Sequence, residues 1–176
     1  GQSISGVPRV DARGQGGLLD VALSPQFETD RTLFLSFSEP RDGGNGTSVA
    51  RAVLSADRRS LEQVQVIFRV LPTYDGTAHY GSRIAFGPDG MLYVTTGERS
   101  VSAMRKFAQQ ADSHLGKVVR IQPDGTASVY ASDLGVACGI AFGPDDALYV
   151  GDRSGSILRV EGGRAGQVGG IPPCSA

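Results

Sequence analysis

Apolar and polar residues alternate along much of this chain. Short stretches with an apolar side chain at every second position, bounded by turn residues, occur at 33–37, 91–94, 117–121 and 157–160. A side-chain period of two is typical of β-strands that bury one face. The stretch 103–110 is compatible with one or two helical turns, but its apolar face is poor. The pattern therefore predicts an all-β fold.

A sequence repeat organises these strands. The segment 84–94, which reads IAFGPDGMLYV, recurs at 140–150 as IAFGPDDALYV, and a weaker copy begins at Val21. In each strong copy an apolar strand ends at a Pro-Asp turn, and a second strand then returns beside the first. A repeat of roughly 40–50 residues with four short strands is typical of a β-propeller blade, and loop insertions lengthen such repeats.

The repeat predicts a single partial β-propeller over residues 1–176, built of four-stranded antiparallel sheets. Residues 5–8 resemble 169–172, so the chain begins and ends at equivalent points of a blade. We expect about three blades, half of a six-bladed ring, at approximately 11–72, 73–133 and 134–174. Closed propellers have about 4–8 blades, and an open arc exposes sheet faces. Either the arc belongs to something larger, or a homodimer completes the ring.

Composition excludes two classes of partner. The net charge is −1 with charges spread along the chain, which gives no electrostatic case for nucleic acid or an anionic membrane surface. The sequence contains no run of about 18 apolar residues, so it predicts no membrane-spanning helix. The two cysteines, Cys138 and Cys174, match no common metal motif. A disulfide between them stays open, although we favour buried or incidental thiols.

Three segments carry candidate chemistry. Gln15 lies in a glycine-rich entry to an apolar strand, where its amide can donate and accept. His79 and Arg83 precede an inner strand, at the expected mouth of a central channel; the imidazole suits a general base and the guanidinium suits an anion. Glu98 follows the second strand of the same blade and is placed to orient His79. Structural turns and surface charges are the alternative interpretation at each position.

The other candidates are weaker. His114 is interpreted as a residue of a surface loop, and Lys117 as either structural or ligand-facing. Because the chain has two histidines, a multi-histidine metal site within one chain is excluded. A lactonase-type hydrolytic propeller would need several converging acidic ligands, and Asp20, Glu98 and Asp152 form no convincing cluster in the sequence.

Several segments together resemble one protein family. Residues 6–27, with GQGGLLDVALSPQF, residues 79–90, with HYGSRIAFGPDG, and residues 115–121, with LGKVVRI, resemble the soluble PQQ-dependent aldose/glucose dehydrogenases of the glucose/sorbosone dehydrogenase family. Their order and spacing agree as well, and the resemblance covers about residues 1–126.

The resemblance implies a six-bladed propeller that binds pyrroloquinoline quinone (PQQ) over its central channel, with calcium polarising the quinone. It implies that His79 is the base for aldose oxidation, in which hydride passes from C1 to the quinone. Glu98 then matches the carboxylate partner, Gln15 a residue near the quinone, and Arg83 a recurring arginine beside the histidine. It also implies a periplasmic or secreted protein.

The chain departs from the family pattern after Gly125. The arginine–asparagine pair, the calcium-binding carbonyls and the later lysine and arginine residues that grip the quinone carboxylates are absent from this sequence. Two functions therefore compete: a PQQ-dependent sugar dehydrogenase that needs a second copy or further sequence, and a truncated propeller that acts as a binding or scaffold module.

Overall fold

The computed structural model describes residues 3–122, 124–161 and 164–170 and contains three four-stranded antiparallel sheets. The strands of the first sheet follow one another in sequence order: β1 (Leu18–Leu23), β2 (Thr32–Arg41), β3 (Gly44–Leu54) and β4 (Leu61–Arg69).

The other two sheets have the same meander order. The second sheet consists of β5 (Gly81–Phe86), β6 (Leu92–Thr96), β7 (Val118–Ile121) and β8 (Ala127–Ala131). The third sheet consists of β9 (Ala137–Phe142), β10 (Leu148–Asp152), β11 (Ser156–Glu161) and β12 (Arg164–Gly170). The expected all-β fold of four-stranded antiparallel sheets is confirmed.

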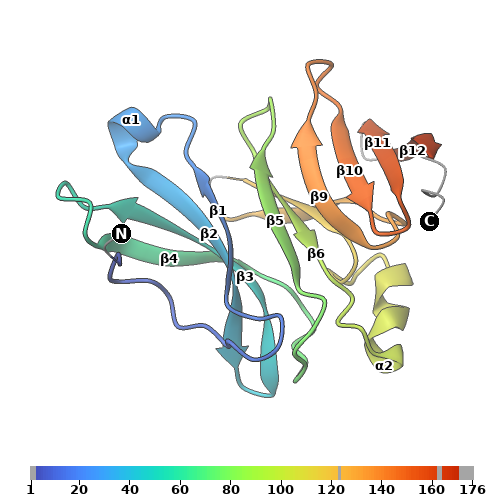
Figure 1. Ribbon diagram of the computed structural model, residues 1–176, viewed down its shortest axis with the longest axis horizontal. Helices are drawn as coiled ribbons and strands as arrows, with labels where there is room; N and C mark the ends of the chain where they lie inside the picture. The colour runs from blue at the N-terminus through green and yellow to red at the C-terminus, as the bar shows by residue number, and fades with distance from the viewer. Residues whose placement is uncertain (1–2, 123, 162–163, 171–176) are drawn as a thin grey trace, which may run out of the picture.

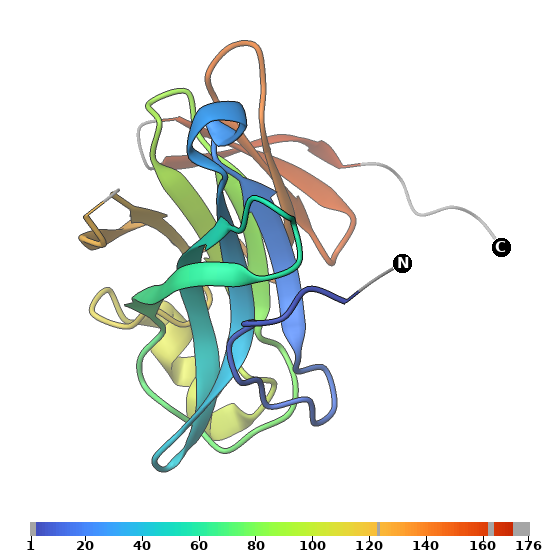
Figure 2. The ribbon, with the colours of Figure 1, turned by 90° about the vertical axis from the view of Figure 1, so that its left-hand side faces the viewer.

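The sheets are arranged as consecutive blades of a propeller. Strand β5 contacts both β1 and β9, so the first strands of the three sheets lie side by side (Figure 1). Seen from its left-hand side, the molecule shows the first sheet in front of the other two (Figure 2). The sheets occupy 18–69, 81–131 and 137–170. The expected end of the third blade at residue 174, and the segment 171–172 of the terminal similarity, lie outside the described residues.

Helical structure is confined to short segments. Helix α1 spans Phe27–Asp30, helix α2 spans Ser102–Arg105, and a 3-10 turn follows at Lys106–Gln109. The last two occupy the stretch for which one or two turns were expected. Within the described residues, no helix is both long and apolar enough to cross a bilayer.

The repeat forms the same hairpin in the second and third blades. Strand β5 ends at Phe86 and β6 begins at Leu92, and Gly90 in the turn has a φ of 73°. In the third blade the equivalent turn residue is Asp146, with a φ of 58°. Aspartate is one of the few residues besides glycine that adopt this left-handed region readily. The substitution therefore preserves the turn.

Two hydrophobic clusters fill the spaces between the blades. The first joins Val49 and Phe68 of the first sheet to Ile84 and Val94 of the second. The second joins the face of the second sheet that carries Tyr93 to the third sheet. Each blade is thus held mainly by apolar packing against its neighbour, which is how the first strands come to lie side by side.

Candidate active site

The loop before β5 holds His79 in an unusual backbone conformation. His79 has a φ of 49°, in the left-handed region that non-glycine residues seldom occupy. Its backbone N–H donates to Gln15 Oε1 at 2.9 Å, and its carbonyl accepts from the N–H of Arg99 at 3.3 Å. Such a conformation persists only where the surroundings determine it, and it is often associated with function.

Two glycines bring the end of β6 against this loop. Gly81 at the start of β5 and Gly97 after β6 face each other across the hairpin, and Gly97 N–H donates to the carbonyl of Tyr80 at 3.0 Å. A Cβ atom at Gly97 would overlap the carbonyl oxygen of His79. The close backbone approach that only glycine permits places the next residue, Glu98, beside the imidazole.

His79 and Glu98 form the expected pair. Nδ1 of His79 lies 3.0 Å and 2.9 Å from the two carboxylate oxygens of Glu98. Both side chains are mostly buried, with 20% and 15% of their surface exposed. A carboxylate favours the tautomer with the proton on Nδ1, which leaves the lone pair of Nε2 available as a base. Arg105 Nε lies 3.4 Å from the same carboxylate.

Gln15 reaches the same loop from the N-terminal segment. Its backbone N–H donates to the carbonyl of Thr77 at 2.7 Å, while its side-chain oxygen accepts from His79. A Cβ at Gly14 would lie 2.5 Å from the Thr77 carbonyl oxygen, so this glycine permits the close contact. The Gln15 Nε2 group makes no hydrogen bond within the described residues and can donate to a ligand.

These residues line a cavity of about 470 Å³ that is formed by all three blades. Such a volume is within the range of small-molecule sites. The lining comes from the segment that enters β1, from the loops around β5 and β6 in the second blade, and from the loops around β9 and β10 in the third. Its residues are Gln15, Leu19, His79, Tyr80, Gly81, Thr96, Gly97, Glu98, Ala108, Gly116, Gly135, Val136, Ala137, Cys138 and Arg153. Glu98, His79 and Gln15 are therefore brought together.

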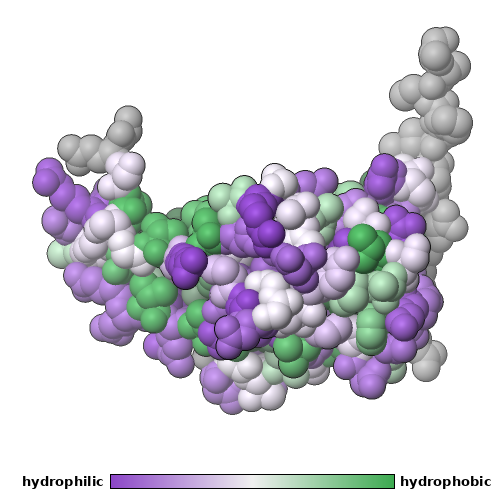
Figure 3. Space-filling view, turned by 90° about the horizontal axis from the view of Figure 1, so that it is seen from below, coloured by the Kyte–Doolittle hydropathy of each residue, from purple (hydrophilic) through white to green (hydrophobic). Residues whose placement is uncertain are grey.

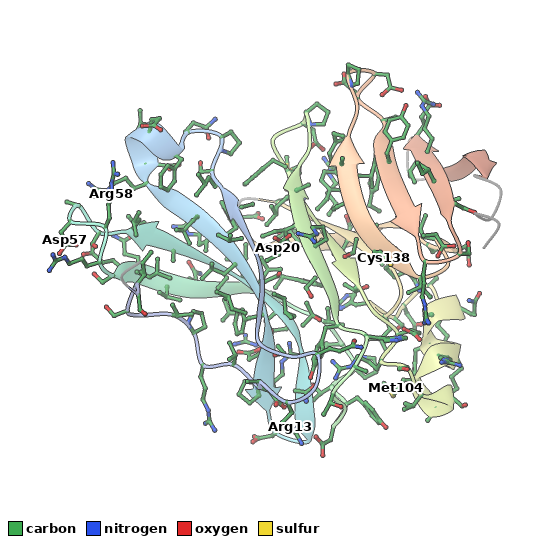
Figure 4. The ribbon with its side chains drawn as sticks, viewed as in Figure 1. Arg13, Asp20, Asp57, Arg58, Met104 and Cys138 are labelled. Atoms are coloured by element: carbon green, nitrogen blue, oxygen red, sulfur yellow. The ribbon has the colours of Figure 1, made fainter. Side chains whose placement is uncertain are left out.

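The third blade contributes two residues that sequence reasoning did not assign to the site. Cys138 lies at the start of β9, as labelled in Figure 4, and Arg153 directly follows β10. Arg153 makes no side-chain hydrogen bond or ion pair within the described part of the chain. The repeat carried a signal for it, because Glu98 likewise follows the second strand of its blade.

Arg83 is placed differently from the other candidates. It does not line the cavity, and its Nη1 lies 3.2 Å from Asp20 Oδ1. Asp20 Oδ2 also accepts from the N–H of Ile84 at 2.9 Å, so this carboxylate joins β1 to β5. Asp20 is labelled beside β5 in Figure 4. The proposed contact of Arg83 with a cofactor stays a prediction.

Two buried cations support the site from behind. Arg99 stacks on the ring of Tyr80 at 3.9 Å and donates to Asn45 Oδ1 and Gly76 O at 2.6 Å and 2.7 Å. Lys117 donates to the carbonyls of Ala108 and Leu115. Burial lowers the pKa of both Arg99 and Lys117. Of the two interpretations of Lys117, its full burial and its carbonyl partners favour the structural one.

Three further expectations can be compared with the structure. His114 lies in a loop but is partly buried, where its Nδ1 accepts from Leu71 N–H at 3.2 Å and its ring packs on Phe68. Burial lowers the pKa of His114. Cys138 is exposed at the cavity, so of the two favoured interpretations, a buried or an incidental thiol, burial does not apply to it. Cys174 lies outside the described residues, and the pairing question stays with it.

The remaining chemistry of this end is polar. Seen from below, the surface at this end of the blades is largely hydrophilic, with apolar residues interspersed (Figure 3). Among the residues that the structure describes, no group of three or more His, Cys, Asp or Glu side chains is arranged to hold a metal ion.

Known proteins resemble the chain over most of its length. Aldose sugar dehydrogenase YliI of Escherichia coli strain K12 is 41% identical over 123 residues, covering 69% of this chain and 32% of the relative. Quinoprotein glucose dehydrogenase B of Acinetobacter calcoaceticus is 28% identical over 144 residues, covering 68% and 30%. The chain therefore spans about a third of the length of these relatives.

Solved structures have the same fold. The soluble aldose sugar dehydrogenase of Escherichia coli in its apo form superimposes with a TM-score of 0.77 at 32% identity, covering 93% of this chain and 51% of that one. The PQQ-bound aldose sugar dehydrogenase of Streptomyces coelicolor gives 0.76 at 28% identity, covering 89% and 49%. The glucose/sorbosone dehydrogenase family model matches residues 1–132. The chain belongs to the glucose/sorbosone dehydrogenase family.

Proposed function

We propose that the chain provides the base-bearing half of a PQQ-dependent aldose dehydrogenase. The observation that carries the proposal is the pairing of His79 Nδ1 with both oxygens of Glu98 at the wall of a ligand-sized cavity, next to the amide of Gln15. A base held in one tautomer, within reach of a bound small molecule, is what removal of a hydroxyl proton requires.

In this proposal the substrate is an aldose with a C1 hydroxyl. His79 Nε2 takes the hydroxyl proton, a C1–O double bond forms as hydride leaves C1, and the sugar becomes its lactone. PQQ, when bound, supplies the two-electron acceptor for that hydride. Glu98 keeps Nδ1 protonated and stabilises the imidazolium, and Gln15 fixes the loop by accepting from the His79 N–H.

The cavity offers part of what PQQ needs. The cofactor has three carboxylates, and each needs a cation or hydrogen-bond donors. Among the side chains of the described cavity wall, Gln15 Nε2 and the guanidinium of Arg153 are donors without a partner. We propose that these two hold the cofactor from this side, and that Arg83 contributes only if it leaves Asp20. Two donor groups serve one carboxylate, and the other carboxylates then need groups beyond this arc.

The proposal has three further parts: calcium, a cellular location and an oligomeric state. Calcium and a periplasmic or secreted location are supported by the family resemblance alone. A homodimer that completes the ring is supported by the three blades of this chain, which cover 49–54% of each of the two glucose dehydrogenase structures that superimpose with a TM-score of 0.79.

The test is reconstitution of the purified chain with PQQ and calcium, followed by removal of free cofactor. We expect the quinone absorbance to stay with the protein and dye-linked aldose oxidation to appear. His79→Asn should retain the quinone and lose the activity, because the Asn amide can still donate to Glu98 but provides no base. His114→Asn is the matched control at the other histidine and should retain activity. A wild-type chain without bound quinone and without activity contradicts the proposal.

A binding or scaffold module is the second candidate, and the number of unpaired cations at the cavity favours it. Within the described residues the cavity wall has one unpaired cationic side chain, Arg153, whereas the cofactor has three carboxylates. A folded chain that binds an aldose in calorimetry but retains no quinone would support this alternative. A chain that retains quinone would exclude it.

A further inference from the structure

Three donors from different parts of the chain converge on the carbonyl of Gly76, at the start of the loop that carries His79. This oxygen accepts from Asn45 Nδ2 at 2.8 Å, from Tyr80 OH at 2.9 Å and from Arg99 Nη2 at 2.7 Å. A carbonyl oxygen has two lone pairs, so its capacity as an acceptor is fully used. The start of the loop is thereby fixed both to β3 and to the end of the loop itself.

Arg99 also holds the other end of this loop. Its backbone N–H donates to the carbonyl of His79 at 3.3 Å, and its guanidinium stacks on the ring of Tyr80 at 3.9 Å from the centroid. Together with the bond to Gly76, one residue contacts both ends of the loop. It does so from the segment after β6, where its neighbour in the chain is Glu98.

The backbone at Arg99 places its side chain away from that of Glu98. Arg99 and Ser100 have φ values of 69° and 65°, in the left-handed region. Glu98 lines the cavity, whereas Arg99 is 3% exposed and is not part of the lining. Two adjacent residues therefore hold the loop from two sides, the carboxylate at the imidazole and the guanidinium beneath it.

The guanidinium is poorly suited to stabilising the fold by itself. Its Nε and Nη1 groups are buried and find no hydrogen-bond partner among the described residues. Burying a cation costs free energy, and an apolar side chain of similar volume avoids that cost. What the guanidinium adds is a rigid, flat group that stacks on one end of a loop while it donates to the other.

We propose that Arg99 is a positioning residue that keeps the imidazole of His79 in register with the carboxylate of Glu98. It fixes both ends of the loop and adjoins Glu98, so the base and its partner are held as one unit. Because Arg99 does not line the cavity, it acts through these two residues and not on a substrate. The consequence for catalysis rests on the proposed function, whereas the geometry does not.

The tautomer of His79 provides a test that needs no cofactor. The contact with Glu98 should keep the proton of His79 on Nδ1. His114 should carry its proton on Nε2, because its Nδ1 accepts from the N–H of Leu71. The chain has two histidines, so nitrogen-15 NMR of the neutral imidazoles distinguishes them, and His114 is an internal control.

Arg99→Met removes the donors and keeps most of the volume. The nitrogen shifts of His79 should then move toward values averaged over both tautomers, while those of His114 stay in place. Arg99→Lys keeps the charge but loses the flat group, so it should give a smaller change in the same direction. Arg41→Met is the matched control, since this largely buried arginine donates to groups of β2, β3 and the residue after β4, and it should leave His79 unchanged.

The same variants should separate kcat from KM in the reconstituted chain. Arg99→Met should lower kcat about 10²-fold, the loss expected when a reacting group moves by about 1 Å, with little change in KM. Arg99→Lys should recover part of kcat, and Arg41→Met should keep it. A loss that instead followed the urea midpoint of each variant, Arg41→Met included, would show a merely structural role and overturn the proposal.

Circular dichroism checks that each variant folds. If Arg99→Met does not fold, Arg99→Lys and Tyr80→Phe decide the question; the latter removes one donor to Gly76 and should shift the His79 nitrogens by a smaller amount. Folded Arg99 variants with the wild-type nitrogen shifts of His79 would overturn the proposal, as would a wild type whose His79 is already averaged. A chain that loses the His79 tautomer with Arg99 but retains no quinone would contradict only the enzymatic proposal.

Discussion

Glu98 and Asp152 lie at the ends of the second strands of neighbouring blades, and their carboxylates have different partners. Glu98 accepts from a side chain, the imidazole of His79. Asp152 accepts from the N–H of Val136 at 2.7 Å, the N–H of Ser154 at 3.1 Å and the hydroxyl of Ser154. One carboxylate orients a reactive group, while the other closes the loop that enters its own blade.

On the faces of these blades the residues are alike, and their surroundings differ. In the second blade Tyr93 OH donates to Asp89, which also pairs with Arg120. In the third blade Tyr149 OH donates to Asp145, which also pairs with Arg159. These two Asp–Tyr–Arg triplets are alike in residues and register, and they differ in what covers them. Tyr93 is 3% exposed beneath Phe142, whereas Tyr149 has no ring above it among the described residues. The repeat therefore preserves the residues through which one blade packs on the next. The candidate catalytic residues lie in the loops, where the blades differ.

The largest expected effect separates the two carboxylates. Glu98→Gln should lower kcat about 10²–10⁴-fold with little change in KM, because the imidazolium loses its charged partner. Asp152→Asn should keep most of the turnover per folded molecule and lower the free energy of unfolding by about 1–2 kcal/mol, because Val136 N–H loses its charged acceptor. Steady-state kinetics of the reconstituted chain and urea unfolding measure the two quantities.

Rescue makes the role of Glu98 distinct from a structural one. Glu98→Asp should recover part of kcat, whereas a merely structural effect would follow the stability of each variant. Equal loss of turnover in Glu98→Gln and Asp152→Asn would remove the distinction between the blades.

The next effect compares two glycines near the ends of the second strands of these blades, Gly97 just after β6 and Gly151 within β10. Gly97→Ala should lower the free energy of unfolding by about 2–3 kcal/mol, because the new Cβ overlaps the His79 carbonyl. At Gly151 of β10 a Cβ meets nothing within 4 Å, so Gly151→Ala should change stability by less than about 1 kcal/mol. Both are measured by urea unfolding of the purified chain. A Gly97→Ala chain as stable as its parent would refute the close approach.

Much of the fold could be predicted, because its signals are local. The strands at 33–37 and 117–121 alternate with the period of a half-buried sheet, and both lie within observed strands or overlap them. The repeat gave the hairpin of the second blade again in the third, even with Asp146 in place of glycine. Alternation and turn chemistry are written in neighbouring residues, so they need no knowledge of distant contacts.

The site was less accessible, because its geometry depends on contacts distant in sequence. The sequence named His79, Glu98 and Gln15, but their contact requires a left-handed His79 and a backbone approach at Gly97. Arg153 escaped notice because a lone arginine after a strand resembles a solvated charge. For Cys138 the sequence allowed a buried or an incidental thiol, and the structure places it exposed at the cavity.

A smaller effect measures the covering of the two tyrosines. Tyr93→Phe should cost about 1–2 kcal/mol, because a buried hydrogen bond to Asp89 is lost. Tyr149 is less buried than Tyr93, so Tyr149→Phe should cost about half as much, because water can replace the bond to Asp145. Urea unfolding of the two variants measures both costs. Equal costs would mean that the packing of Phe142 on Tyr93 does not exclude water from its hydroxyl.

The smallest effect is a delayed titration in alkali. Burial, followed by the hydrogen bond to Asp89, raises the pKa of Tyr93 above its ordinary value of about 10. The folded chain therefore keeps this proton when the unfolded chain has lost it. The resulting stability is complete below about pH 10 and decreases as the pH rises toward the pKa of the folded state. Phenolate absorbance should show a late-titrating group that Tyr93→Phe removes. If Tyr93→Phe left the late phase unchanged, the delayed titration would not come from the buried tyrosine of the second blade.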